Sequence, residues 1–364
     1  MNKLEEARKN INEIDNEMAA LFVKRMEAAK LISEYKMERG LPILDQNREN
    51  ELIAKNSAFV EDETLRSYYV NFLKDTMSIS RKYQQMLQQG LVVAYSGVEG
   101  AFANIAAKNI FPNAKQVPFG DFTSAYEAVV NGECDCAVLP IENSYAGEVS
   151  QVIDLMFQGG LYINGIYDLE VTHNHLGLPG SSIDDIRTVI SHPQALEQCA
   201  KYIKKHDFEA VRANNTAIAA QQVIERGDKS VAAIASRDTA KLYGLNVLER
   251  RINESSQNTT RFAVFSRADS LPDYKESGRQ FIMVFTVRDE AGALAQAINI
   301  IGDCGFNMRT LRSRPMKELM WKYYFYVEAD GNAYSEKGRK MMKELSQYCD
   351  HLRIIGSFPH EKKL

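Results

Sequence analysis

Apolar side chains follow a heptad spacing through residues 4–39, and this pattern predicts one long helix. Such a pattern is typical of a helix that packs along its length against partner helices. The apolar seam of this helix consists of Leu4, Ala7, Ile11, Ile14, Met18, Leu21, Ala28, Ile32 and Tyr35. Arg25 stands at a seam position where an apolar residue is expected. Because an unpaired buried guanidinium costs roughly several kcal/mol, the pattern predicts an anion beside Arg25.

Two further cations, Arg8 and Lys36, flank the apolar seam. Three cations at one helix interface indicate a site for a small, multiply anionic molecule inside a helical bundle. The alternative is structural. Arg25 could form an ion pair with an acidic residue of the next helix, or its long side chain could extend so that the guanidinium reaches solvent. The candidate partners are Asp45, Glu49 and Glu51. The first helix by itself does not decide between these interpretations.

Residues 1–89 contain almost no strand pattern, and two more helices are expected after the first. Gly40, Leu41 and Pro42 interrupt the first helix, and Asp45 is a suitable N-cap for the second. The third helix is expected from about 62 to 89, with a continuing seam at Leu65, Tyr69, Phe72, Ile79, Tyr83 and Met86. Ser80 and Gln84 lie four residues apart beside it. Since three helices cannot bury both seams alone, we expect this block to form a dimer.

From Gly90 the pattern changes to short apolar runs separated by helical stretches, which is typical of a parallel α/β sheet. The runs are LVVAYSG, CDCAVLPI, TVISH, SVAAIAS and RFAVFS. Polar residues follow several runs and precede helices, where any one of them could be an ordinary helix cap. Their number favours a carboxylate-binding site at the carboxyl ends of the strands. The clusters are 96–97, 142–144, 191–194, 214–216 and 258–261.

Residues 268–277 are polar and rich in turn formers, so we expect a linker there. The following residues, 278–358, give the order β-α-β-β-α-β, which is the ferredoxin-like motif. The chain therefore divides into 1–89 (all-helical), 90–267 (α/β) and 278–358 (α+β).

Composition excludes several functions. The chain has 44 Lys and Arg against 48 Asp and Glu, so it lacks the basic excess of a nucleic-acid binder. No apolar run approaches a membrane span and no signal peptide precedes the first helix, so we expect a cytoplasmic protein. Five scattered cysteines suggest reduced thiols, and six histidines lack metal-ligand spacing. We expect no metal and no cofactor.

All three blocks, in this order, resemble the bifunctional chorismate mutase–prephenate dehydratase family over essentially the whole chain. The first block matches the all-helical mutase class at Arg8, Arg25, Lys36, Asp45, Arg48, Glu49, Ser80 and Gln84. The resemblance implies an intertwined dimer, in which Arg8 comes from the partner subunit and joins Arg25 in clamping the carboxylates of chorismate. Lys36 and Gln84 are expected to donate to the ether oxygen. Glu49, with Asp45 and Ser80, is expected to hold the ring hydroxyl or a carboxylate.

The middle block resembles prephenate dehydratase at 138–149 (VLPIENSYAGEV), 191–199 (SHPQALEQC) and 258–262 (NTTRF). This implies a two-lobed domain like periplasmic binding proteins, which converts prephenate to phenylpyruvate with Thr260 assisting departure of the hydroxide. Ala101 stands where the family usually carries a hydroxyl residue. Further expected substrate contacts are Glu142, Asn143, Ser144, Ser191, His192, Gln194, Asn215, Thr216, Arg261 and Phe262.

The last block resembles an ACT regulatory domain, which binds amino acids between subunits. Phenylalanine feedback and a homo-oligomer, dimer or tetramer, are therefore implied. Arg312 replaces the glutamate of the family pattern and would reverse a charge beside the effector site. The expected effector contacts are Gly292, Ala293, Leu294, Asn307, Met308, Arg312, Ser313, Arg314 and Pro315.

Two other functions fit the sequence less well. A mutase fused to prephenate dehydrogenase needs a G-x-G-x-x-G fingerprint after a strand, and the sequence contains none. An amino-acid-sensing regulator with a DNA-binding head needs a basic surface and a short helix-turn-helix, whereas the helical block has a balanced charge and a long seam.

Overall fold

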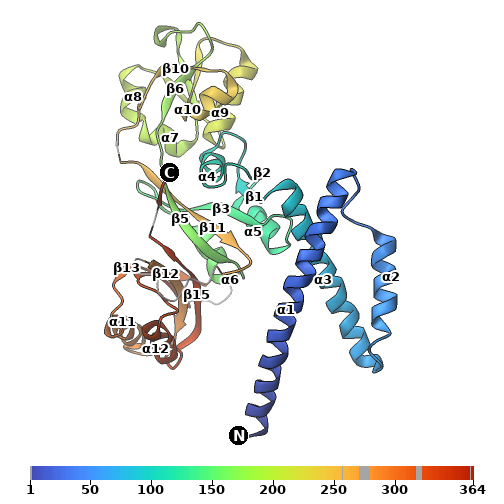
Figure 1. Ribbon diagram of the computed structural model, residues 1–364. Coiled ribbons are helices and arrows are strands. Elements are labelled where there is room, and N and C mark those ends of the chain that lie inside the picture. Colours follow the sequence, from blue (N-terminus) through green and yellow to red (C-terminus); the bar gives the residue numbers. More distant parts are fainter. Residues whose placement is uncertain (1, 256, 270–278, 317–321, 361) are drawn as a thin grey trace. The chain divides into compact units, whose positions relative to one another are not determined.

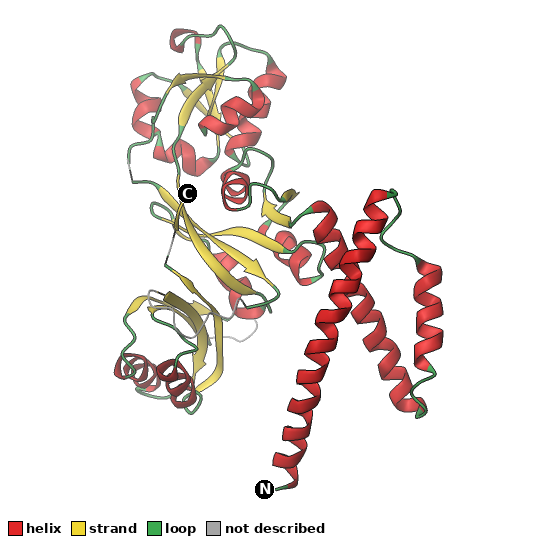
Figure 2. Ribbon diagram, in the orientation of Figure 1, coloured by secondary structure: helices red, strands yellow, loops and turns green. Residues whose placement is uncertain are grey.

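The computed structural model describes residues 2–255, 257–269, 279–316, 322–360 and 362–364. The chain forms two compact units, Met1–Leu91 and Val92–Leu364. Figures 1 and 2 show a helical first unit and a second unit of mixed strands and helices. Most of the linker predicted at 268–277 lies outside the described residues.

The first unit consists of three helices, as predicted: α1 (Lys3–Glu38), α2 (Gln46–Ser57) and α3 (Glu63–Gln89). Asn2 and Glu5 form a capping box at the start of α1. Asp45 accepts a hydrogen bond from the Arg48 backbone N–H, which confirms its predicted capping role. Figure 1 shows the N-terminal half of α1 extending beyond the other two helices.

Within one chain the apolar seam of α1 is exposed. Leu21 is 63% exposed, and α1 instead buries Ala29 and Ser33 against α3. The buried face of α3 consists of Leu73, Met77, Ser80 and Gln84. The apolar positions predicted for the seam of α3 are largely exposed within one chain, because the helix turns a different, more polar face toward α1. The apolar seams of both helices remain available to another molecule.

The first lobe of the second unit is a sheet of seven described strands in the order β16-β5-β11-β3-β1-β2, with β4 paired to β3. Helices α4 (Phe102–Ile110), α5 (Phe122–Val130) and α6 (Ser150–Gln158) accompany it. The strands are β1 (Val92–Ser96), β2 (Lys115–Phe119), β3 (Cys136–Asn143), β4 (Gly147–Glu148), β5 (Tyr162–Glu170), β11 (Thr259–Ser266) and β16 (Lys362–Lys363).

The second lobe is a separate sheet in the order β10-β6-β9-β7-β8. Its strands are β6 (Asn174–Gly177), β7 (Thr188–Ser191), β8 (Glu209–Arg212), β9 (Val231–Ala235) and β10 (Asn246–Glu249). Its helices are η1 (Ile183–Asp185), α7 (Pro193–Gln198), α8 (Ala200–Lys205), α9 (Thr216–Arg226) and α10 (Arg237–Tyr243). The chain enters this lobe after β5 and returns to the first lobe through β11, so two connections join the lobes.

Both sheets are mixed, which corrects the prediction of a parallel sheet. β1, β2 and β3 pair in parallel, but β11 runs antiparallel to both β3 and β5. In the second lobe β6 is antiparallel to β9 and β10. The returning strand, RFAVFS, looks like any buried parallel strand in sequence, since hydrophobicity does not encode strand direction.

The C-terminal residues fold into the β-α-β-β-α-β order that the sequence predicted. The sheet order is β13-β14-β12-β15, and Figure 1 shows α11 and α12 together on one side of it. The elements are β12 (Arg279–Val287), α11 (Ala293–Asp303), β13 (Met308–Pro315), β14 (Tyr323–Asp330), α12 (Glu336–Leu345) and β15 (Cys349–Pro359).

The central strand β12 is buried on both faces. Phe281, Met283 and Phe285 pack against α11 and α12, whereas Ile282 and Val284 join the core of the first lobe. The final residues, Lys362–Lys363, pair with β5 in parallel. The C-terminal fold and the dehydratase-like lobes therefore share one core, and the chain continues past the predicted boundary at 358 back to the first sheet. Among the described residues, none of the helices combines the length and apolarity that crossing a membrane requires.

This shared core makes a stability prediction at Gly356. A Cβ atom at this position would lie 2.0 Å from the backbone oxygen of Ile163, where β15 packs on β5. Backbone cannot yield as a flexible side chain can, so Gly356→Ala should destabilise the second unit by at least about 2 kcal/mol. Urea denaturation followed by circular dichroism measures this effect.

Gly302→Ala is the matched control. Gly302 lies in α11, and a Cβ atom added there would meet open space, so alanine should be neutral or should stabilise by up to ~1 kcal/mol. If Gly356→Ala unfolds at the same urea concentration as the unmodified protein, the packing of β15 on β5 is looser than described.

Candidate active sites

The Arg25 side chain lies between α1 and α3 and contacts neutral groups. One guanidinium nitrogen donates to the Ser80 hydroxyl and to the Thr76 backbone oxygen, the latter at 3.2 Å. Burial lowers the pKa of Arg25 from its ordinary value, and the charge of Glu49 partly offsets this effect. A guanidinium nevertheless stays protonated at neutral pH.

The acidic residues that could have neutralised Arg25 are committed elsewhere. Glu49 forms an ion pair with Arg81, Glu51 pairs with Arg48 at 3.4 Å, and Asp45 caps α2. Among the described residues, no carboxylate lies within ion-pair distance of Arg25. The ion-pair alternative for Arg25 is therefore not met inside one chain, and Glu49 offsets its positive charge only in part.

Lys36 and Gln84 retain hydrogen-bonding capacity. The Lys36 ammonium donates to the Ile43 backbone oxygen at 2.6 Å, which leaves two of its three N–H groups. Gln84 is 7% exposed, and its buried Oε1 atom has no partner among the described residues. Arg81, which sequence reasoning missed, orients Glu49. Its position one residue after Ser80 on the polar face of α3 was the available signal.

Two predicted mutase residues lie away from this group in the single chain. Arg48 is exposed and pairs with Glu51 of its own helix. Arg8 is exposed on the N-terminal half of α1, 17 positions before Arg25. At about 1.5 Å per residue the two guanidinium-bearing positions are roughly 25 Å apart along the helix. One chain cannot bring Arg8 and Arg25 to the same small molecule.

A cleft of about 490 Å³ lies between the two lobes of the second unit. Its lining combines ends of strands from the first lobe with helix starts from the second. The predicted residues that line it are Asn143, His192, Gln194, Asn215, Thr216, Thr260 and Phe262. Ser96, Gly97 and Ala101 also contribute, and Ala101 brings no hydroxyl, as the sequence indicated.

Asn143 and Thr260 form the polar floor of the cleft. They are paired residues in the β3–β11 ladder, and Asn143 Nδ2 donates to Thr260 Oγ1 at 2.9 Å. Gln194 Nε2 from the second lobe donates to Asn143 Oδ1 at 3.2 Å, so this contact crosses the cleft. Asn215 and His192 cap helices α9 and α7, and burial lowers the pKa of His192.

Four predicted dehydratase contacts do not line the cleft. Ser191 is fully buried and donates to the Ile234 backbone oxygen, and Ser144 donates to the Gln257 backbone oxygen. Glu142 and Arg261 pair with each other at 3.1 Å and face the C-terminal fold. The expectation that Glu142 and Arg261 face the cleft is corrected, because strand alternation turns each of them away from its catalytic neighbour.

Two polar residues that line the cleft, His173 and Gln198, were missed, and Asn258 lies beside them without lining it. Asn258 donates to Gln198 Oε1 at 2.8 Å and accepts from Asn143 at 2.9 Å, and His173 Nε2 lies 2.8 Å from the same Gln198 oxygen. Gln198 and Asn258 lie inside motifs that the sequence had already singled out. His173 follows β5 in a stretch without a recognisable pattern, so only the fold reveals it.

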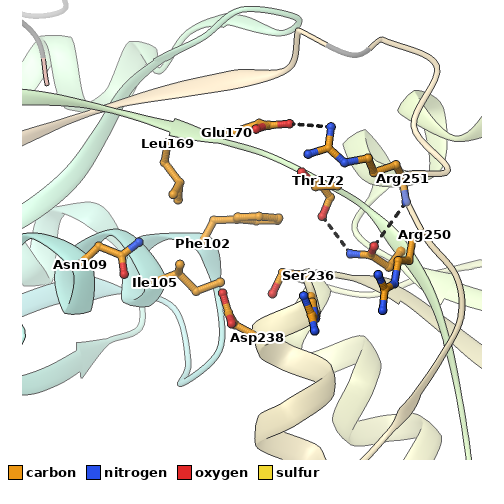
Figure 3. A pocket seen from close by; sticks show the side chains of 12 residues that line it. Phe102, Ile105, Asn109, Leu169, Glu170, Thr172, Ser236, Asp238, Arg250 and Arg251 are labelled. Carbon is orange, nitrogen blue, oxygen red and sulfur yellow. Dashed lines mark hydrogen bonds and ion pairs between the residues drawn. The ribbon is translucent and has the colours of Figure 1, made fainter. Parts of the chain in front are cut away.

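A second hollow of about 320 Å³, shown in Figure 3, shares Phe102 with the cleft. Its charged groups are exposed, and several are paired: Arg251 with Glu170 at 3.2 Å, and Asp238 with Lys241 at 3.5 Å. None of the predicted dehydratase residues lines it. The cleft at Thr260 is therefore the candidate for dehydration.

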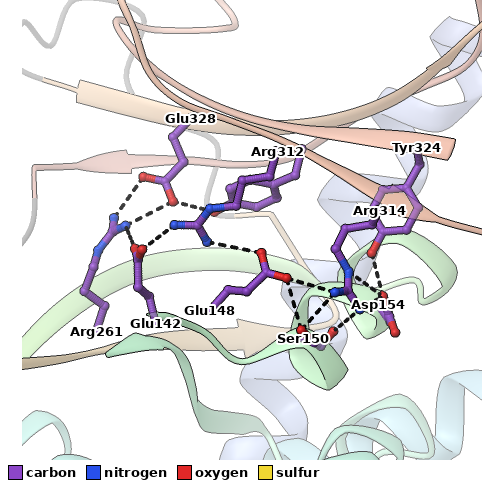
Figure 4. A network of polar contacts seen from close by, with 10 residues as sticks. Glu142, Glu148, Ser150, Asp154, Arg261, Arg312, Arg314, Tyr324 and Glu328 are labelled. Atoms are coloured by element: carbon purple, nitrogen blue, oxygen red, sulfur yellow. Dashed lines mark hydrogen bonds and ion pairs between the residues drawn. The ribbon is translucent and has the colours of Figure 1, made fainter. Parts of the chain in front are cut away.

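A network of ion pairs joins the C-terminal fold to the first lobe (Figure 4). Arg312 forms an ion pair with Glu142, and Arg261 bonds Glu328 at 3.0 Å. Arg314 contacts Glu148 at 2.8 Å and Asp154 at 2.9 Å. Although burial alone would lower the pKa of Arg314, its bonds to Asp154 and Tyr324 and the charges of Asp154 and Glu148 raise it.

Two of the predicted effector contacts belong to this network. Arg312 and Arg314 point to acids of the first lobe instead of to the loop at Gly292. The remaining predicted positions stay within their own fold: Gly292 starts α11 with φ of 85°, Ala293 and Leu294 follow it, and Asn307 donates to Asp330. Met308, Ser313 and Pro315 belong to β13, which pairs only with β14 among the described strands.

Comparison with known proteins agrees with both catalytic domains. Residues 7–85 match the family described as chorismate mutase type II, and residues 93–270 match prephenate dehydratase. A bifunctional chorismate mutase/prephenate dehydratase of Aquifex aeolicus is 30% identical over 370 residues, covering 99% of this chain and 98% of that relative.

Two solved structures resemble the second unit, each covering 74% of this chain. A prephenate dehydratase from Arthrobacter aurescens in complex with L-Phe has a TM-score of 0.69 at 27% identity, over 90% of its own length. A protein described as a quorum quenching acylase, GqqA, has the same TM-score at 31% identity, over 97% of its length.

Both catalytic domains are matched in order, and the alignment with the bifunctional relative spans nearly the whole of each chain. The chain is thus an enzyme with chorismate mutase and prephenate dehydratase activities, and it belongs to the bifunctional chorismate mutase/prephenate dehydratases of phenylalanine biosynthesis.

Proposed function

We propose that Arg25 anchors chorismate in the helical unit and that a second copy of the chain completes this site. The observation that carries the proposal is the guanidinium of Arg25, which contacts neutral partners while the nearby acids are paired elsewhere. A carboxylate of chorismate supplies the missing negative charge. Arg8 of a second copy supplies the second clamp, since Arg8 of the same chain is roughly 25 Å away along α1.

The exposed apolar seam supports this assembly. Ile11, Ile14 and Leu21 are each more than half exposed in one chain, and a face of this length needs cover from another helix. A homodimer covers it with the same face of its partner, as the isologous symmetry of most homo-oligomers requires. Dimerisation then buries the seam and brings Arg8 to the partner's Arg25 in one step.

The rearrangement of chorismate is pericyclic and transfers no proton. Catalysis comes from holding the compact conformer of the substrate and from stabilising negative charge on the breaking ether oxygen. Lys36 and Gln84 are suited to the second task, because Lys36 keeps spare N–H donors and the Gln84 side chain carries an NH₂ donor group. Ser80, on α3, accepts a hydrogen bond from Arg25 and holds its side chain in place.

Subunit complementation tests the shared site. Arg8→Ala and Arg25→Leu should each reduce mutase kcat/KM by at least about 100-fold, since each removes one carboxylate clamp. When the two variants are mixed, unfolded and refolded together, half of the dimers are hybrids with one intact site. Mutase activity should return to about a quarter of that of the unmodified protein.

The controls follow from the same geometry. Arg25→Leu should also fold more stably than the unmodified protein, because it removes a partly buried charge. Each variant refolded alone should stay inactive. If hybrid dimers form but mutase activity does not return, Arg8 and Arg25 do not meet across the subunit interface. They would then belong to one site within one chain, or to different sites.

In the second unit, we infer that Thr260 assists departure of the ring hydroxyl of prephenate. The C–C bond to the carboxylate breaks as CO₂ leaves, and its electron pair enters the ring while the C–O bond breaks. The leaving hydroxide takes a hydrogen bond from Thr260 as it forms and becomes water with a proton from solvent. Thr260 is suited to this role because its oxygen accepts from Asn143, which leaves its own hydrogen for the cleft.

Thr260→Ala should reduce dehydratase kcat by about 100- to 1,000-fold while chorismate is still converted to prephenate. Thr259→Ala is the matched control, since Thr259 precedes Thr260 on β11 and does not line the cleft. Coupled assays started with chorismate and with prephenate measure both steps. An equal loss of the two activities in Thr260→Ala would contradict independent sites.

Finally, we propose that phenylalanine inhibits the dehydratase by binding to the C-terminal fold. The relative solved with L-Phe supports this ligand, and the positive φ of Gly292 exposes backbone amides at the start of α11. The ion-pair network supplies the coupling, because Glu142 and Arg261 immediately adjoin Asn143 and Thr260. A rotation of β13 would move these neighbours of the cleft.

Arg312→Gln should weaken inhibition by phenylalanine about 5- to 30-fold, measured as the concentration giving half-inhibition of the dehydratase. Arg309→Gln is the matched control. Arg309 lies on the same strand but pairs with Asp330 of its own fold, so its loss should leave inhibition close to that of the unmodified enzyme. An unchanged response in Arg312→Gln would exclude this route, and the absence of any response in the unmodified enzyme would exclude feedback itself.

A further inference from the structure

A chain of buried polar side chains leads from Thr260 along the cleft, which Gln198 and His173 also line. Its members are Asn143, Asn258, Gln198 and His173, which are 7%, 2%, 4% and 2% exposed. Asn143 ends β3, Asn258 directly precedes β11, and His173 follows β5. Gln198 ends α7 in the second lobe, so this series of side chains crosses from one lobe to the other. Buried polar groups of this kind rarely persist unless their hydrogen bonds are satisfied in one arrangement.

The orientation of the Asn143 amide is fixed by backbone groups. Its Oδ1 atom lies 3.0 Å from both the Tyr145 and the Ala146 backbone nitrogens. Backbone N–H groups can only donate, so the atom facing them must be the carbonyl oxygen. The Asn143 NH₂ group therefore faces Thr260 Oγ1 and Asn258 Oδ1, each at 2.9 Å.

The direction of every later bond follows from this anchor. Asn258 must present its oxygen to Asn143, so its NH₂ group donates to Gln198 Oε1 at 2.8 Å. The same Gln198 oxygen lies 2.8 Å from His173 Nε2, which can bond it only as an N–H donor. His173 is thus protonated on Nε2, while its buried Nδ1 atom has no partner among the described residues.

His173 holds this tautomer in a neutral ring. Burial lowers its pKa to about 4, an effect that the bond to Gln198 partly opposes and the charge of His192 reinforces. Phe102 packs against the ring edge-to-face, with centroids 5.7 Å apart. If Nε2 lost its hydrogen, Gln198 would have to turn its NH₂ toward His173 and Asn258, and two donors would then face each other.

We propose that His173 is a positioning residue for dehydration: through Gln198 it holds the Asn258 oxygen against the Asn143 NH₂ group and so steadies the donor to Thr260, which offers its own hydrogen to the departing hydroxyl. The proposal rests on the proposed role of Thr260. The backbone N–H groups at 145–146 set which way the Asn143 amide faces, and the imidazole N–H fixes Gln198 at the other end of the chain. Without the imidazole N–H, Gln198 can rotate, Asn258 loses its fixed acceptor, and the Asn143 side chain is held less tightly at Thr260.

His173→Phe and His173→Gln in the full-length enzyme test the proposal. Phenylalanine keeps a ring against Phe102 but has no N–H, whereas glutamine keeps an N–H donor at similar reach. His173→Phe should lower dehydratase kcat on the order of 30-fold with KM changed less than about threefold, because the chain acts on the leaving group in the transition state. His173→Gln should recover kcat to within about fivefold of the unmodified enzyme.

Mutase turnover and the thermal midpoint serve as folding controls, since the mutase residues lie in the other compact unit. The proposal is overturned if His173→Phe keeps kcat within twofold of the unmodified enzyme, or if a folded His173→Gln is as impaired as His173→Phe. A general loss of packing would lower both variants alike and would not be rescued by glutamine.

A second measurement does not depend on the variants' folding. In the ¹⁵N-histidine spectrum of the unmodified enzyme, His173 should carry hydrogen on Nε2 and none on Nδ1, unchanged between about pH 6 and pH 8. An Nδ1–H tautomer or an imidazolium in that range contradicts the proposal. Thr260→Ala separates the role of Thr260 from that of His173. If Thr260→Ala keeps dehydratase activity, the donor role of Thr260 is refuted. If Thr260→Ala is inactive but His173→Phe is normal, only the role of His173 is refuted.

Discussion

The register of β3 against β11 is the constraint on which the dehydratase unit depends. It pairs Thr260 with Asn143 and Arg261 with Glu142, and the register shifts between Arg261 and Phe262. Pro140 and Asn143 consequently both line the cleft, although strict alternation would place them on opposite faces. One strand pair thereby carries the Asn143–Thr260 hydrogen bond on one face and ion pairs to the C-terminal fold on the other.

This arrangement links the C-terminal fold to the cleft through few residues. The C-terminal sheet is buried on both sides, with its own helices on one face and the core of the first lobe on the other. Such a sheet cannot shift without disturbing the first lobe, because packed cores deform little. The charged network at Arg312 and Arg314 borders the same interface, so a change in the C-terminal fold has a short path to Glu142 and to the cleft.

In the helical unit, two features of the single chain lack a partner. Within one chain, Arg25 has no ion-pair partner among the described residues. The apolar seam of α1 is also exposed. The polar face of α3, with Ser80 and Gln84, packs on α1 instead of the apolar positions. Burial within one chain therefore places polar side chains of α3 against α1, and the apolar seam positions stay exposed.

Local pattern in the sequence determined the three helices, five strands of the α/β block, the β-α-β-β-α-β order of the last block and the capping by Asp45, because periodicity and turn chemistry act over a few residues. It also singled out Arg25, Asn143 and Thr260. Strand direction, the bulge that brings both Pro140 and Asn143 to the cleft, and the meeting of His173 with Gln198 depend on contacts between distant segments. Those contacts leave no local pattern, so only the tertiary structure decided which polar residues of each motif face the cleft and which join the domains.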